Sequence, residues 1–156
     1  MIVDGTGKKL LAGDFPASPD GMEWNAAGLF VSFERDGEHR VAKVNPSSGA
    51  PTLLEPRFGS TYYALPYTGG QWSVSEGGAI AFTTASSVAP PEVGVATRRG
   101  TKTLTSLTSL NAVSLGAKVL GQTFELDVTA PDGVKIPAWI MLPPGYEEGD
   151  KVTTIL

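Results

Sequence analysis

The chain contains one histidine, His39, and serine-hydrolase chemistry would need that residue as its base. In such enzymes a histidine activates the serine nucleophile, and a carboxylate orients the histidine. His39 lies in the polar stretch "RDGEHR" between two expected strands, and no Gly-x-Ser-x-Gly elbow occurs in the sequence. We therefore interpret His39 as a solvated turn residue and expect no catalytic residue in this chain.

Other polar clusters are equally weak as sites. Asp4-Gly5-Thr6-Gly7 lacks the third glycine of a dinucleotide fingerprint. Glu147, Glu148 and Asp150 share one loop without a histidine or asparagine, a pattern typical of a solvated connection. Glu92 follows two prolines at the start of an expected strand, where an edge or substrate-facing role is conceivable, but we do not assign it to a site. We predict no cofactor-binding residue and no metal ligand.

Charge and composition exclude several classes of partner. The 12 basic and 16 acidic residues give a net charge of -4, and no basic cluster exceeds the Arg98-Arg99 pair, so nucleic acid is not an expected partner. Apolar runs of about five residues are far shorter than the roughly 20 that span a bilayer. The N-terminus lacks the features of a signal peptide. We expect a soluble protein, in the cytoplasm rather than exported. The absence of cysteine excludes disulfides but does not separate a reducing compartment from a disulfide-free exported protein.

The composition and an internal repeat predict a turn-rich β protein. There are 19 glycines and 12 prolines, 31 of the 156 residues, a share well above the usual value of about 12%. "WNAAGLFVSF", from Trp24 to Phe33, is echoed by "WSVSEGGAIAF", from Trp72 to Phe82. Each stretch has a tryptophan, a polar segment, a glycine and then an alternating strand, which indicates a repeated unit.

A second recurring feature gives the length of that unit. A leucine follows a glycine by four residues at Gly7/Leu11, Gly49/Leu53 and Gly100/Leu104. A period of roughly 40 to 50 residues with several short strands is typical of β-propeller blades. Blades must stack on their neighbours to cover both faces. We therefore expect one face to be formed by alternating apolar residues of each unit, and Trp24 and Trp72 to be wedged between blades. The apolar residues are Leu29, Val31 and Phe33 in the first unit and Ile80 and Phe82 in the second.

The pattern changes after Leu104. Up to Gly121 the alternation fades, which indicates a connector with one turn of helix at most. Two alternating strands, at about 123–129 and 135–142, then flank Asp132-Gly133, a dipeptide favoured in tight hairpins because it tolerates positive φ. Pro143-Pro144-Gly145 ends the second strand, and we expect a third strand from Val152.

These segments resemble a known family. "FELDVTAPDGVKIPAWIMLPPGYEEGDKVTTIL", from Phe124 to Leu156, resembles the entry into the catalytic domain of the prolyl oligopeptidase family, in its acylaminoacyl-peptidase and dipeptidyl-peptidase-like branch. "GGAIAFTTASSVAPPEVGVATRRGTKTLTSLTSLN" resembles the last propeller blade of that family, and "SPDGMEWNAAGLFVSF" resembles a blade opening. The most specific part is the Asp-Gly hairpin, Trp139, Pro143-Pro144-Gly145 and the following strand. Thr153 departs from the family, whose members commonly have a proline there.

The resemblance implies a mainly β fold, with a partial β-propeller of two to three blades followed by the first strands of an α/β-hydrolase sheet. Its expected parts are C-terminal blades over 1–111, a linker over 112–122 and the start of a peptidase domain over 123–156. In α/β-hydrolases the oxyanion loop follows the third strand, and the nucleophile, acid and histidine come later. We therefore expect a fragment of a serine peptidase that acts on peptides, inactive by itself. The alternative from the residues is a propeller-type binding or scaffold module. Neither reading sets an oligomeric state.

Overall fold

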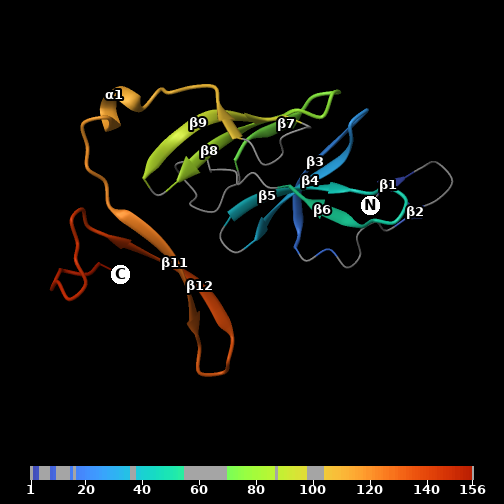
Figure 1. Cartoon of the computed structure of the whole chain (residues 1–156). Coiled ribbons are helices and arrows are strands. Elements are labelled where there is room, and N and C mark those ends of the chain that lie inside the picture. The colour runs from blue at the N-terminus through green and yellow to red at the C-terminus, as the bar shows by residue number, and fades with distance from the viewer. Residues whose placement is uncertain are drawn as a thin grey trace.

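The chain is built mainly from antiparallel β-sheets (Figure 1). The computed structural model describes residues 2–3, 8–9, 15, 17–35, 38–54, 70–86, 88–97 and 104–155. Two short strands, β1 (Ile2–Val3) and β2 (Lys8–Lys9), pair near the N-terminus. Among the described residues no sheet closes into a barrel, and helix is confined to one turn. The predicted mainly β class is confirmed.

The first four-stranded sheet has its strands in chain order. It consists of β3 (Pro19–Asn25), β4 (Gly28–Arg35), β5 (Glu38–Val44) and β6 (Pro51–Leu53). Gly28, where β4 begins, and Gly49, between β5 and β6, adopt positive φ, a conformation that glycine reaches without strain. Each neighbouring pair is antiparallel, so the sheet is a simple meander.

The second sheet repeats this arrangement. It consists of β7 (Trp72–Val74), β8 (Ile80–Ser86), β9 (Ala89–Ala96) and β10 (Leu104–Ser106), again antiparallel and in chain order. The segments "LFVSFER" and "IAFTTAS", whose alternation predicted strands, are strands in the structure. Of the recurring glycine-leucine pairs, Gly7, Leu11 and Gly100 lie outside the described residues.

The two sheets pack face to face through a shared core. From the first sheet this core contains Phe30, Val41 and Leu54, and from the second Val74, Ile80, Phe82 and Ala96. The opposite face of the first sheet has its own cluster, formed by Leu29, Val31, Phe33, Ala42 and Val44 with Phe15 and Ala17 packed against it. Because successive residues of a strand point to opposite faces, β4 is buried on both sides. The expected alternation is confirmed in both units.

The first strands of the two sheets meet directly. Among the described strands, contact between the sheets is made by β3 and β7. The Glu23 carboxylate accepts a hydrogen bond from the Val74 backbone N–H at 2.8 Å, and the Asn25 side chain donates to the Val74 carbonyl at 2.7 Å. These contacts satisfy backbone groups at the edge of β7 that would otherwise be unpaired.

The two tryptophans occupy different environments. Trp72 is partly buried against the core shared by the sheets. Trp24 is 56% exposed, so the prediction that it is wedged between blades is wrong. On β3, Trp24 pairs with Leu29, whose side chain faces away from the second sheet and belongs to the other cluster. The register therefore turns Trp24 away from the shared core.

The connector and the hairpin follow the second sheet. Helix α1 (Ala112–Leu115) is the single turn expected in the linker. Strands β11 (Gln122–Thr129) and β12 (Lys135–Leu142) then pair antiparallel from Gln122↔Leu142 to Thr129↔Lys135, and Gly133 adopts a φ of 86° in the turn. The hairpin extends away from both sheets (Figure 1). The predicted hairpin is confirmed.

The third strand predicted from Val152 does not form within residues 151–155. A strand needs a partner for its backbone hydrogen bonds, and none of the described strands pairs with this segment. Among the described residues, no helix is long and apolar enough to cross a membrane.

Candidate functional site

His39 is buried between the two sheets rather than solvated in a turn. It is the second residue of β5, pairs with Glu34 of β4, and is 6% exposed. Because side chains alternate along a strand, His39 shares a face with Val41, and Glu34 shares a face with Phe30. Val41 and Phe30 both belong to the shared core. The prediction of a solvated turn residue is wrong, because the strand starts one residue before the histidine.

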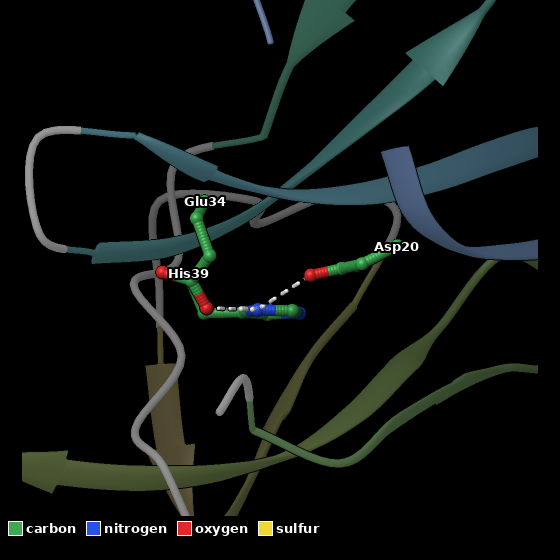
Figure 2. Close-up of side chains that lie close together, drawn as sticks. All are labelled: Asp20, Glu34 and His39. Carbon is green, nitrogen blue, oxygen red and sulfur yellow. Dashed lines mark hydrogen bonds and ion pairs between the residues drawn. The ribbon is translucent and has the colours of Figure 1, made fainter. Parts of the chain in front are cut away.

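Two carboxylates approach the same nitrogen of this imidazole. Glu34 Oε1 lies 3.0 Å from His39 Nδ1, and Asp20 Oδ2 lies 3.5 Å from it. Figure 2 shows both carboxylates directed toward this nitrogen. The two acidic side chains are 42% and 41% exposed. The trio therefore joins a buried base to a solvent-accessible pair of acids.

A bulge in β3 directs Asp20 toward the histidine. Pro19 pairs with Phe33 and Gly21 with Ser32, which leaves Asp20 as the extra residue of β3. A bulge changes the direction of side chains along its strand, and here the Asp20 carboxylate reaches the face that carries Ser32. The buried Ser32 hydroxyl donates to Asp20 Oδ1 at 2.5 Å. This bond holds one carboxylate oxygen and leaves Oδ2 facing His39.

Gly21 permits the close approach of β3 to Ser32. A Cβ atom at Gly21 would lie 2.5 Å from Ser32 Oγ and 3.7 Å from Trp72 Nε1. The first distance is shorter than any stable contact. A glycine at this position therefore lets the serine hydroxyl remain beside Asp20.

The serine, acid and histidine do not form a nucleophilic triad. Nucleophilic catalysis requires the serine hydroxyl to donate to the histidine, whereas the Ser32 hydroxyl donates to Asp20. Ser32 is also 1% exposed, so a substrate carbonyl has no access to it. The arrangement suits the binding of positive charge at two carboxylates and an imidazole.

Sequence reasoning missed this trio, although part of its pattern was visible. "ERDGEH" places a glutamate and a histidine at equal distances from the Asp36-Gly37 dipeptide, and a tight hairpin there would make Glu34 and His39 cross-strand neighbours. Asp20 is different, because its contribution depends on a bulge. No residue pattern in the sequence marked that bulge.

Glu92, which was not assigned to a site, connects the second sheet to the linker. Its carboxylate accepts hydrogen bonds from the Thr108 hydroxyl, the Asn111 backbone N–H at 2.9 Å and the Asn111 side chain at 3.0 Å. These contacts lower the pKa of Glu92 from 4.5 to about 2, and the bond from Thr108 has the largest effect. Glu92 therefore fixes the point where the chain leaves the sheet.

A cavity of about 560 Å³ lies between the first sheet and the hairpin. Glu38 and Arg40 line it from β5, and the hairpin contributes the remaining residues, including Trp139. Arg40 donates to Glu38 at 3.0 Å and to the Leu54 carbonyl at 3.3 Å. The cavity is a concave surface with charged and aromatic groups, and the trio around His39 does not line it.

Comparison with protein-family models and with curated proteins gave no match to this chain.

Proposed function

We propose that the chain forms two blades of a β-propeller and the first hairpin of an α/β-hydrolase domain, in a serine peptidase of the prolyl oligopeptidase family. The observation that carries this proposal is the contact between β3 and β7. These are the first strands of two successive four-stranded meanders. In a propeller, blades are arranged around a central channel, and corresponding strands of neighbouring blades converge toward it.

Burial in the first sheet supports the assignment of blades. One face packs against the second sheet and the other against Phe15 and Ala17. An isolated two-layer sandwich would leave the outer face of each sheet to solvent. A sheet covered on both faces fits a unit that is stacked between neighbours.

The hairpin supports the hydrolase part of the proposal. Its cross-strand pairs Phe124↔Ile140 and Val128↔Ile136 lie on one apolar face, and these four side chains are each 45% to 49% exposed. A two-stranded hairpin is marginally stable in water, and an apolar sheet face requires a cover. In an α/β-hydrolase, further strands and helices would supply that cover.

In this function the blades restrict the access of peptide substrates to a catalytic centre built by other segments. The cavity between β5 and the hairpin, with Trp139 in its wall, lies at the junction of the two parts. The described residues of this chain contribute neither a nucleophile paired with a histidine nor an oxyanion loop. We therefore assign the chain a binding and gating role without turnover.

The coding sequence downstream of Leu156 tests this proposal. We expect an oxyanion loop, then a Gly-x-Ser-x-Gly elbow, then an aspartate and a histidine in that order. Further blade repeats in the same reading frame, without such an elbow, would instead identify a propeller-type binding or scaffold module and overturn the peptidase assignment.

A further inference from the structure

We propose that Asp20, Glu34 and His39 form a binding site for one divalent transition-metal ion, with Zn²⁺ preferred over Mn²⁺. Each residue offers one ligand atom, and these atoms all lie within 4.8 Å of one another. The site is independent of the peptidase proposal, because it rests on side chains within the first sheet.

The donor spacing fits tetrahedral coordination. Zinc bonds to nitrogen and oxygen of about 2.0–2.1 Å place neighbouring ligand atoms about 3.3 Å apart in a tetrahedron. The distances from His39 Nδ1 to Glu34 and Asp20, 3.0 and 3.5 Å, lie on either side of that value. To complete this geometry, the two carboxylates need only move closer to each other. Both side chains are partly exposed, so they have room to rotate.

The scaffold holds the three ligands on separate strands. Asp20 comes from β3, Glu34 from β4 and His39 from β5, and neighbouring strands are hydrogen-bonded along their length. The Ser32 hydroxyl orients the Asp20 carboxylate. A hydrogen bond that holds a metal ligand in place typically strengthens metal binding about 10- to 100-fold.

Charge and access also favour a cation. Two carboxylates face one imidazole, so the trio keeps net negative charge whether or not the imidazole is protonated. A divalent ion would offset that charge. It would enter from the side of the two half-exposed acids, and water could complete its coordination there. Binding at Nδ1 requires the imidazole to carry its proton on Nε2, so the ring must release any Nδ1 proton when the ion binds.

The ligand set selects the metal. An imidazole nitrogen favours zinc and later transition metals, whereas sites made only of oxygen favour Mg²⁺, Ca²⁺ and Mn²⁺. With one imidazole among three ligands, zinc should bind more tightly than manganese, in accord with the general order of affinities. The bound ion would connect edge strand β3 to the β4–β5 hairpin at one end of the core between the sheets.

The experiment uses the whole chain, purified without a polyhistidine tag and treated with EDTA, which is then removed. Isothermal titration with ZnCl₂ should give one ion per chain, and MnCl₂ should bind at least about tenfold more weakly. Because His39 is the single histidine, the ring signals in an NMR spectrum belong to it, and Zn²⁺ should shift Nδ1 more than Nε2. Thermal unfolding should move to higher temperature with Zn²⁺, since the ligand binds the folded state.

Variants locate the ion. Glu34→Gln and Asp20→Asn keep the shape of half-exposed side chains, and each should weaken zinc binding about tenfold or more. Glu148→Gln, an exposed residue of a separate loop, is the matched control and should bind zinc as the original chain does. Stoichiometry above one ion, unshifted ring signals or equal affinity in all three variants would overturn the proposal. In that outcome the trio is an ion-pair network without a metal.

Discussion

Glu34 and His39 face each other across the β4–β5 hairpin, with Glu34 Oε1 3.0 Å from His39 Nδ1. The pair lies on the same face as Phe30 and Val41, so it continues the core between the sheets with polar groups. A buried polar group needs a partner, since leaving it unpaired costs about 1–3 kcal/mol. The pairing therefore explains how a histidine can occupy the end of an apolar core.

Gly21→Ala should destabilise the fold. The new Cβ would collide with Ser32 Oγ, which must then leave Asp20 or push β3 away from β4. Overpacking of this kind typically costs about 1–3 kcal/mol, measurable as a lower midpoint of urea unfolding.

Gly77→Ala is the matched control for that substitution. Its Cβ would meet only Ser75 Oγ, at 3.9 Å, an ordinary contact, so its midpoint should change little. Equal effects of the two substitutions would contradict the role of Gly21 in positioning Ser32.

Acidic pH should weaken the hydrogen bonds of Glu92 that hold the segment where the chain leaves the second sheet. The pKa of Glu92 is lowered from 4.5 in its ordinary state to about 2, so its hydrogen bonds stabilise the fold fully above pH 4.5. That contribution is lost as the pH falls from 4.5 through about 2, where the folded carboxyl takes up its proton.

Amide hydrogen exchange at Asn111 gives a local measurement of this effect. The Asn111 N–H donates to Glu92, so its protection should fall over that pH window, relative to amides within β8. In Glu92→Gln the protection should already be low at neutral pH and should not change over the window. Unchanged protection of Asn111 in this variant would show that the carboxylate does not anchor the linker.

The apolar face of the hairpin should make the isolated chain associate. Val128, Ile136 and Ile140 share that face and are each nearly half exposed, and exposed apolar patches favour association. Ile136→Lys should therefore shift the chain toward the monomer in sedimentation velocity. Thr129→Lys, on the other face of β11, adds the same charge and should have a smaller effect. If both substitutions act equally, added charge rather than the apolar face controls association.

Local patterns in the sequence were sufficient to predict most strands. Alternation over Leu29 to Phe33 and the Asp132-Gly133 turn predict β4 and the β11–β12 hairpin, because both depend on neighbouring residues. The two residues whose environment was predicted wrongly, Trp24 and His39, are placed by contacts with residues distant in the sequence. Trp24 is exposed because the register of β3 turns it away from the second sheet. His39 is buried on the face of β5 that carries Val41 of the shared core. The candidate site escaped prediction because the bulge at Asp20 leaves no pattern in the sequence.

The chain should show no peptidase or esterase activity by itself. Acyl transfer requires an activated nucleophile and a stabilised oxyanion. The buried Ser32 donates to Asp20, while His39 Nδ1 faces two carboxylates. Loss of triad members from a complete enzyme already lowers kcat by several orders of magnitude. The purified chain should therefore leave chromogenic aminoacyl and short-ester substrates unchanged beyond the rate in buffer, as should His39→Ala. Turnover that follows the chain through purification and disappears in His39→Ala would make His39 catalytic and refute the non-catalytic assignment.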